Sequence, residues 1–216
     1  MNIFRLVGDM LHLSAILILI YRIRKSRNCI GLSCKTQEIY LVVFALRYMD
    51  LFMYYISLYN TSMKVLFISL TIFIIYMMRF QKPFCTTYDA MGDDFPHFKI
   101  LVPAAVVLTL IVQSGWTPWE LTWTFTLWLE ALAFLPQIVM MSKVRIVENI
   151  TSHYVAALGL YRFFYILNWV YRWQVEGFFC WTQVLSGTLQ TGLYLDFLYN
   201  YYVSMKEGKP VIELPI

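Results

Sequence analysis

Charged residues are scarce in this chain: Asp, Glu, Lys and Arg make up 14% of its 216 residues, against roughly 25% in an average soluble domain. Apolar residues reach 60%. This composition excludes a disordered chain, and the length excludes a large multidomain enzyme. We therefore expect a membrane protein, in which lipid replaces water as the main surrounding solvent.

Cysteine is also sparse, since the chain has only four cysteines. They are too few and too scattered to predict a disulfide framework, and none lies at a metal-type spacing from a histidine. The sequence contains no nucleophile elbow and no glycine-rich phosphate loop. We therefore expect no catalytic residues, no metal site, no bound cofactor and no nucleic-acid partner.

Seven apolar stretches are present in place of these motifs. A bilayer core about 30 Å thick needs roughly 20 mainly apolar residues per helix. The stretches lie at residues 3–21, 39–59, 63–80, 98–113, 119–141, 154–171 and 178–203. They predict an all-α membrane protein with seven transmembrane helices.

The basic residues indicate the orientation of these helices. Twelve of the seventeen basic residues fall on one side of the predicted helices, and Lys64 alone falls in the loops of the other side. By the positive-inside rule, the N-terminus is luminal, the C-terminus is cytosolic, and residues 204–216 form a cytosolic tail. The twelve are Arg22, Arg24, Lys25, Arg27, Lys35, Arg79, Lys82, Lys99, Lys143, Arg145, Lys206 and Lys209.

A weak internal repeat supports this layout. A shift of 115 residues superposes the first three stretches on the last three and aligns Arg47 with Arg162. Two three-helix blocks joined by a linking helix form a parallel repeat, as in SWEET-like transporter folds. Pro136 and Gln137 form a dipeptide that recurs in PQ-loop membrane proteins. The predicted parts are repeat one at 1–80, the linking helix at 98–113 and repeat two at 117–203, within a transmembrane domain of residues 1–203.

Ten ionisable residues lie within or beside the apolar stretches, where insertion of one charge costs roughly 2.5–3.5 kcal/mol at a helix centre. These residues are Arg5, Asp9, His12, Arg47, Asp50, Glu120, Glu130, Arg162, Arg172 and Asp196. They either form internal salt bridges that fasten helices together or line a polar cavity. Arg5, Asp9 and His12 are four and three residues apart and share one helical face, so we expect such polar faces to point inward together.

Long segments of the sequence resemble the KDEL receptors, the seven-helix proteins that retrieve escaped endoplasmic-reticulum (ER) residents from the Golgi. The resemblance runs almost end to end. It is carried by MNIFRLVGDMLH at 1–12, RYMDLF at 47–52, YNTSMK at 59–64, ELTWTFTLWLEALAFLPQ at 120–137 and ITSHYVAALGLYRFFYILNW at 150–169. It implies a non-enzymatic multi-pass receptor in the lipid of ER, Golgi and COPI-coated vesicle membranes. Its ligand would be the C-terminal Lys-Asp-Glu-Leu-type signal of luminal proteins.

The resemblance also assigns roles to residues of this chain. The signal's terminal carboxylate would pair with Arg47 and Tyr48, its glutamate with Arg5, and its aspartate with Arg172. Bidentate guanidinium–carboxylate pairing suits these roles. The signal's basic residue would be surrounded by Asp50, Glu120 and Trp169. The remaining implied signal-binding residues are Tyr54, Arg162, Tyr165 and Asn168.

The pH dependence of the family maps onto His12, near Tyr161. Histidine has an ordinary pKa of about 6.5, which lies between the pH of a mildly acidic compartment and that of a neutral one. The resemblance thus implies a proton as co-ligand, with the signal bound in the acidic Golgi and released in the neutral ER. Glu130 would hold Arg162 as an internal lock. His97 and His153 lie at loop edges and are expected to be incidental.

Retrograde transport would use the cytosolic end of the chain. The resemblance implies that Lys206 and Lys209 contribute to a COPI coat signal and that Asp196 has a trafficking role. The chain departs from the family pattern at Tyr54, a usual asparagine, and at Cys180, a usual aspartate, so the preferred first residue of the signal is left open.

The alternative function is a SWEET-like proton-coupled small-solute transporter, which the repeat and the Pro-Gln pair suggest. A sugar site needs mainly amides, hydroxyls and aromatic faces. The ionisable residues in the apolar stretches of this chain are instead mainly arginines and acids, which favours the receptor.

Overall fold

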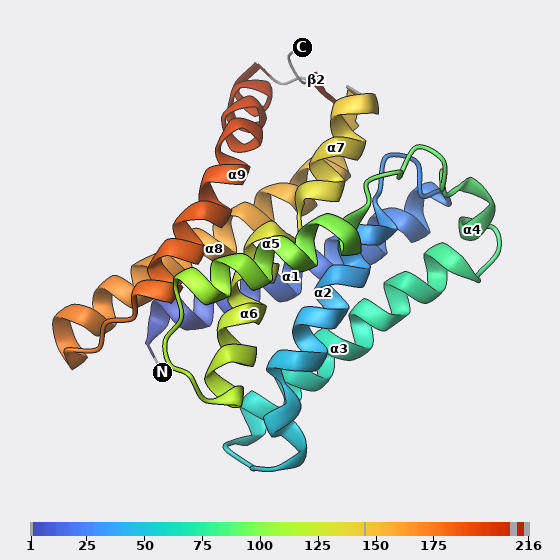
Figure 1. The fold of residues 1–216 in the computed structure, drawn as a ribbon. Helices are drawn as coiled ribbons and strands as arrows, with labels where there is room; N and C mark the ends of the chain where they lie inside the picture. Colours follow the sequence, from blue (N-terminus) through green and yellow to red (C-terminus); the bar gives the residue numbers. More distant parts are fainter. Residues whose placement is uncertain (1, 145, 208–210, 214–216) are drawn as a thin grey trace. The chain divides into compact units, whose positions relative to one another are not determined.

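The computed structural model describes residues 2–144, 146–207 and 211–213, and helices account for most of them (Figure 1). One short antiparallel pair, β1 (Ile146–Glu148) and β2 (Val211–Glu213), is the only sheet in these described ranges. The prediction of an all-α protein with several long apolar helices is therefore confirmed. Contacts divide the chain into two compact units, Met1–Arg27 with Met141–Ile216, and Asn28–Met140.

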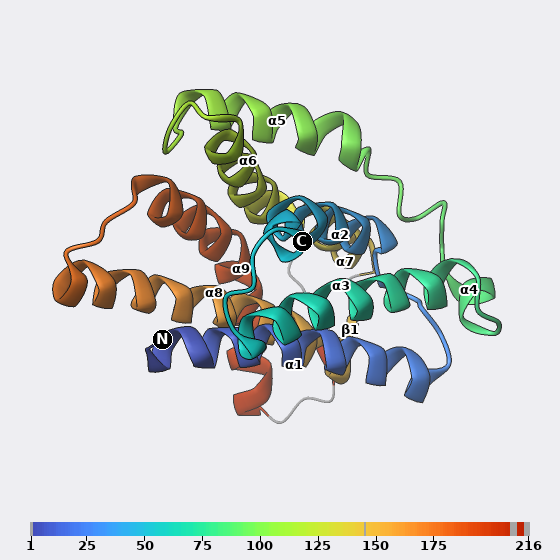
Figure 2. The same ribbon diagram turned by 90° about the horizontal axis from the view of Figure 1, so that it is seen from below.

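Unit one contains the longest helices. In it, α1 (Ile3–Ser26) packs along α8 (Asn149–Glu176), and α8 packs against α9 (Trp181–Glu207), an arrangement that Figure 2 also shows. Asn2 caps the start of α1, because its side chain accepts a hydrogen bond from the backbone N–H of Arg5 at 2.9 Å. The strands β1 and β2 pair with Val147 opposite Ile212, beside α8 and α9.

Unit two is organised around α2. The elements of the unit are α2 (Cys34–Arg47), η1 (Met49–Phe52), α3 (Leu58–Arg79), α4 (Phe84–Thr87), α5 (His97–Ile111) and α6 (Pro118–Leu132), and the boundary between the units falls inside α7 (Leu135–Val144). The helix α2 contacts η1, α3, α5 and α6. Serine or threonine caps begin α2, α3 and α6, through Ser33, Ser57 and Thr117.

Two of the predicted helices are interrupted or cut short in the structure. The prediction of one helix over 39–59 is wrong, because α2 ends at Arg47 and a 3-10 turn and an irregular segment follow. With 14 residues, α2 is only about 21 Å long. The predicted helix over 119–141 is divided between α6 and α7. The break lies beside Pro136, which has no N–H to donate and whose ring disfavours a continuous helix.

The last helix is longer than predicted. Helix α9 continues to Glu207, so its final turn occupies the first residues of the predicted tail at 204–216. Residues 211–213 of that tail form β2.

Three helical segments of the described chain are long and apolar enough to cross a membrane: Ile3–Ser26, Leu58–Arg79 and Pro118–Val144. The shorter apolar helix His97–Ile111 is a fourth apolar segment. Many large apolar side chains on these helices are exposed, including Ile72 and Val107. These features fit a protein surrounded by lipid, and the count of seven spans stays a prediction.

Candidate functional site

His12 of α1 and Tyr161 of α8 form a buried aromatic stack in unit one. Their ring centroids are 4.1 Å apart with an interplanar angle of 10°, and His12 is only 6% exposed. The next turn of α8 adds Tyr165, whose hydroxyl donates a hydrogen bond to the carboxylate of Asp9. The predicted pH-sensing pair is therefore in direct contact, beside an acid on the same helix as the histidine.

Arg162 lies inside the same cluster and is 4% exposed. Its guanidinium carbon is 5.0, 5.7 and 6.0 Å from the ring centroids of Tyr161, Tyr165 and Trp169. The Tyr161 hydroxyl accepts hydrogen bonds from Arg162 Nη2 at 3.2 Å and from Gln190 Nε2 of α9 at 2.9 Å. Aromatic faces therefore surround a buried cation, which electron-rich rings stabilise.

The two other predicted arginines of unit one have different surroundings. Arg5 is exposed, and its side chain makes no ion pair within the described ranges. Arg172 donates from Nε to Glu176 at 2.7 Å and lies 4.2 Å from the centroid of Phe178. Asn168 accepts a hydrogen bond from Asn2 at 2.7 Å. Arg5 is thus the more available of the two for an external anion.

Arg47 is the last residue of α2 and the centre of a polar group in unit two. Its Nη1 donates to the carboxylate of Glu130, and its Nε donates to Thr126 Oγ1 at 3.1 Å. The side chains of Arg47 and Glu130 are 18% and 3% exposed. Arg47 Nη2 is buried and has no hydrogen-bond partner among the described residues. One arm of the guanidinium fork is therefore available to a further acceptor.

Asp50, in the 3-10 turn after α2, forms an ion pair with Lys64 of α3 at 2.6 Å. The Lys64 ammonium also lies 5.7 Å from the ring centroid of Tyr48, which stacks on Phe44. Asp50 Oδ1 is buried without a hydrogen-bond partner in the described part of the chain. In the sequence, Lys64 was counted only as a loop charge. Its partner Asp50 lies fourteen residues earlier and beyond a turn, so no helical spacing relates the two.

The remaining predicted residues of unit two are Glu120 and Tyr54. Glu120 closes the capping box of α6, and its Oε2 accepts from the backbone N–H and the hydroxyl of Thr117. Tyr54 is exposed in the irregular segment after the 3-10 turn. A small pocket in unit two is lined by Leu46, Arg47, Met49, Trp119, Thr122 and Trp123.

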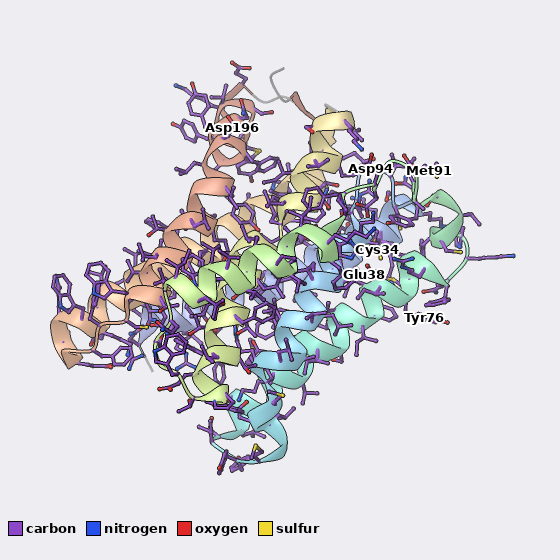
Figure 3. The ribbon with its side chains drawn as sticks, viewed as in Figure 1. Cys34, Glu38, Tyr76, Met91, Asp94 and Asp196 are labelled. Atoms are coloured by element: carbon purple, nitrogen blue, oxygen red, sulfur yellow. The ribbon has the colours of Figure 1, made fainter. Side chains whose placement is uncertain are left out.

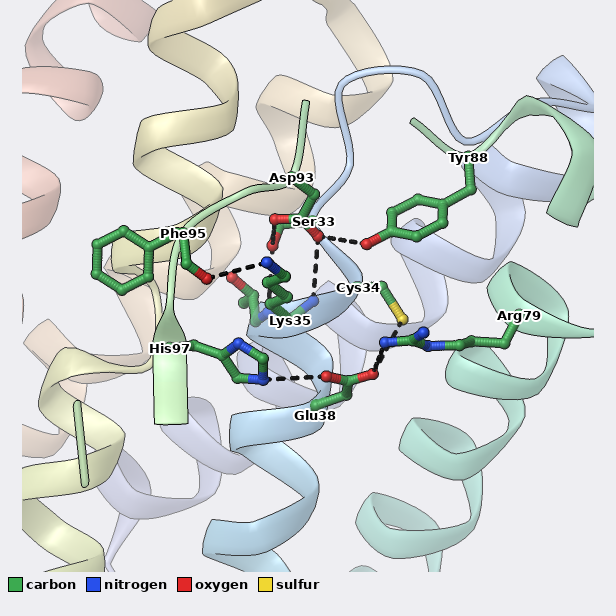
Figure 4. Close-up of polar contacts among 10 residues, drawn as sticks. Ser33, Cys34, Lys35, Glu38, Arg79, Tyr88, Asp93, Phe95 and His97 are labelled. Carbon is green, nitrogen blue, oxygen red and sulfur yellow. Dashed lines mark hydrogen bonds and ion pairs between the residues drawn. The ribbon is translucent and has the colours of Figure 1, made fainter. Parts of the chain in front are cut away.

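A second polar cluster of unit two joins α2, α3 and α5, and sequence reasoning missed it (Figure 4). Glu38 of α2 forms an ion pair with Arg79 of α3, and its Oε2 lies 3.1 Å from Nε2 of His97 of α5. His97 therefore contacts α2 in this cluster. The three residues are 41 and 59 positions apart, so no local spacing could have revealed the cluster.

The loop beside this cluster converges on Asp93, which is buried and accepts from Ser33 Oγ at 2.8 Å and from Tyr88 Oη at 2.6 Å. Burial and the hydrogen bond to Asp93 raise the pKa of Tyr88 well above its ordinary value. Burial, followed by the nearby charge of Glu38, raises the pKa of Cys34 from 9.0 to about 12. Both residues lie outside the apolar stretches predicted to span the membrane, and both stay protonated at physiological pH.

Two of the predicted trafficking residues, Asp196 and Lys206, lie in the C-terminal half of α9. Asp196, which is labelled in Figure 3, is exposed, and its Oδ1 is 3.5 Å from Asn200 Nδ2. Lys206 is exposed in the last helical turn. Lys209 lies outside the described residues.

The predicted site residues thus fall into two groups. Those in unit one are Arg5, His12, Tyr161, Arg162, Tyr165, Asn168, Trp169 and Arg172, and those in unit two are Arg47, Tyr48, Asp50, Tyr54, Glu120 and Glu130. A single site made from both groups stays a prediction, as does the lock between Glu130 and Arg162. Over the described ranges, no three His, Cys, Asp or Glu side chains are grouped so that they could hold a metal ion.

The sequence is similar to proteins of one family. Residues 28–172 match the family model described as ER lumen protein retaining receptor. The chain is 46% identical to the ER lumen protein-retaining receptor of Plasmodium falciparum, over 98% of this chain and 97% of that protein. It is 44% identical to ER lumen protein-retaining receptor B of Arabidopsis thaliana and 45% identical to ER lumen protein-retaining receptor erd-2.2 of Caenorhabditis elegans, over the full length of all three chains.

Proposed function

Because the chain belongs to the ER lumen protein-retaining receptor family, we propose that it binds the C-terminal Lys-Asp-Glu-Leu-type signal of escaped luminal proteins. The signal binds in the acidic Golgi, the receptor carries its cargo back to the ER by COPI-dependent transport, and neutral pH releases it there. The family is one of retention receptors and not of enzymes. The family, together with the membrane-compatible helices of this chain, supports a membrane protein of the secretory pathway. The family therefore favours a receptor over a small-solute transporter.

The available Nη2 of Arg47 is the main support for a ligand that ends in a carboxylate. The signal offers three anions, its terminal carboxylate and two side chains. Nη2 of Arg47 is a buried donor without an acceptor among the described residues, although Nη1 and Nε are both engaged. The terminal carboxylate can therefore bind at Nη2 without displacing Glu130. Tyr48 is the second donor that the resemblance assigns to this carboxylate.

The two other arginines take the acidic side chains of the signal. Arg5 is exposed without an ion pair in the described ranges, so the glutamate of the signal binds there without displacing an internal acid. Arg172 exchanges its exposed partner Glu176 for the aspartate of the signal. An exposed i,i+4 pair contributes only about 0.3–0.5 kcal/mol, so this exchange costs little.

The basic residue of the signal binds to Asp50, Glu120 and the indole face of Trp169. Asp50 supports this role because its Oδ1 has no hydrogen-bond partner among the described residues, while Lys64 holds the other oxygen. A second ammonium group can therefore reach the same carboxylate. Tyr54, Tyr165, Asn168 and Arg162 complete the surroundings of the peptide.

The proton acts as co-ligand at His12, with no other cofactor. An imidazolium ring stacked on the face of Tyr161 gains a cation–π interaction that the neutral ring lacks. Asp9, which accepts from Tyr165, adds a negative charge near this stack, whereas Arg162 opposes a second positive charge. Protonation of His12 therefore changes the net charge of this cluster, and the protonated form favours the ligand-bound state.

The membrane arrangement that goes with this function is the one predicted from the sequence. Seven helices span the lipid bilayer in two three-helix repeats around a linking helix, with a luminal N-terminus and a cytosolic tail. Glu130 acts as the lock on Arg162 that the resemblance implies. Asp196, Lys206 and Lys209 serve the trafficking step, in which the lysines recruit the COPI coat.

Peptide binding tests this function directly. The purified receptor is titrated with a peptide ending in Lys-Asp-Glu-Leu at mildly acidic and at neutral pH, beside the same peptide with an amidated C-terminus. The acid-form peptide is expected to bind more tightly at acidic pH, and amidation is expected to weaken it. A receptor that binds neither form, or binds them equally at both pH values, contradicts the proposal.

A further inference from the structure

Gly187 of α9 faces α8 at the point where the indole of Trp169 lies. A Cβ atom at Gly187 would be 2.3 Å from Cζ3 and 2.7 Å from Cη2 of Trp169, closer than real Cβ contacts. It would also be 3.6 Å from Cδ of Arg162. Both Gly187 and Trp169 are buried. The missing side chain of Gly187 therefore creates the space that the far edge of the indole occupies.

The helix itself gives no reason for a glycine at this position. Gly187 lies well inside α9, where glycine is typically less favourable than alanine by roughly 0.5–1 kcal/mol. Alanine would stabilise the helix, but its methyl group would collide with the indole ring. The function of Gly187 must therefore be sought in the position of Trp169.

The position of Trp169 matters because its ring already lies near a cation. The guanidinium carbon of Arg162 is 6.0 Å from the indole centroid, and Tyr165 packs beside it at 6.1 Å. A cation–π contact depends on the cation lying over the ring face within about 6 Å. A displacement of the far edge by about an ångström turns this face, so a cationic ligand loses its alignment.

We propose that Gly187 is a positioning residue that holds the indole of Trp169 in place and thereby sets the receptor's preference for a cationic first residue in the retrieval signal. The proposal rests on the proposed function, because it concerns the same peptide site. Gly187 does not touch the peptide. It acts through Trp169, so it affects discrimination at one position of the signal rather than binding of the carboxylates.

Gly192 provides a matched control in the same helix. A Cβ atom there would meet no heavy atom within 4 Å. The substitutions Gly187→Ala and Gly192→Ala therefore change the helix propensity in the same way. They differ in whether the new methyl group meets the indole.

The experiment compares two peptides on the full-length receptor at acidic pH, one ending in Lys-Asp-Glu-Leu and one in Gln-Asp-Glu-Leu. The ratio of their affinities measures the preference for a cation. Gly187→Ala is expected to lower this ratio by roughly 2- to 30-fold, the range of a cation–π contribution. Gly192→Ala is expected to leave it unchanged. An unchanged ratio in Gly187→Ala, or an equal fall in Gly192→Ala, overturns the proposal.

A Trp169→Phe background separates positioning from a general packing defect. The smaller ring removes the collision, so adding Gly187→Ala to it is expected to leave the ratio at the value of Trp169→Phe alone. The same double variant is expected to fold if Gly187→Ala alone does not. A double variant that fails to fold, or whose ratio falls further, shows that Gly187 has a different role. If the unmodified receptor binds neither peptide, the proposed function itself fails. If the unmodified receptor binds normally but Gly187→Ala leaves the affinity ratio unchanged, only the role of Gly187 fails.

Discussion

Replacing Arg47 tests whether its available guanidinium arm receives the terminal carboxylate of the signal. The perturbation is Arg47→Gln, which removes the charge and the donor Nη2 while keeping a polar side chain. In the structure Nη2 is buried and lacks an acceptor among the described residues, and the whole side chain is only 18% exposed. A new charge-assisted hydrogen bond at this position should be worth about 1.5–3 kcal/mol. That value corresponds to a 10- to 150-fold change in affinity at about 1.4 kcal/mol per tenfold.

The assay is a binding cycle with the free-acid and the amidated peptide, read by calorimetry or peptide fluorescence. In the unmodified receptor, amidation is expected to weaken binding by about 10- to 150-fold. In Arg47→Gln, this penalty should disappear. Arg79→Gln is the control, since Arg79 pairs with Glu38 in the other polar cluster of the same unit, and it should retain the full penalty. If Arg47→Gln also retains it, the carboxylate binds elsewhere.

Three other predictions follow from the surroundings of single residues. Arg5→Ala and Arg172→Ala should each weaken binding of the free-acid peptide at least tenfold with little loss of stability, because Arg5 is exposed and Arg172 has only an exposed partner; peptide titration and thermal melting check this, and normal affinity in either variant contradicts it. His12→Ala should bind equally at acidic and neutral pH; a retained pH profile contradicts the proton site. At pH 8, Cys34 should react with a soluble alkylating reagent far more slowly in the folded than in the denatured receptor, because a pKa raised from 9.0 to about 12 lowers its thiolate fraction about a thousandfold. The same shift favours the folded state below about pH 9, and this contribution is lost as the pH rises toward 12. Mass spectrometry after timed alkylation measures the rate, and equal rates in both states contradict the argument.

The apolar helices were predictable because their signal is local. Length and composition predicted helices that α1, α3 and α5 match closely. The spacing of Arg5, Asp9 and His12 predicted one inward polar face on α1, and this is right for the buried Asp9 and His12 but wrong for Arg5, which is exposed at the start of the helix. The contact between His12 and Tyr161 was implied by the resemblance rather than by spacing. Capping residues such as Thr117, with Glu120 three positions later, would have located the start of α6.

The long-range pairs were not predictable, since periodicity reports only which residues share a face of one helix. Nothing in the sequence indicates that Glu130 lies beside Arg47, 83 positions away. The end of α2 was missed for a related reason. No glycine or proline follows Arg47 before Ser57, and the turn is instead accompanied by the ion pair of Asp50 with Lys64.

Glu38 joins three helices through one carboxylate. Its two oxygens serve a guanidinium from α3 and an imidazole from α5. Loss of the acid would therefore leave the Arg79 guanidinium without its counter-ion, beside the His97 ring, where the three helix ends converge. The contacts among these three helices therefore depend on one carboxylate. Homologues that lack Glu38 should also have other residues in place of Arg79 and His97.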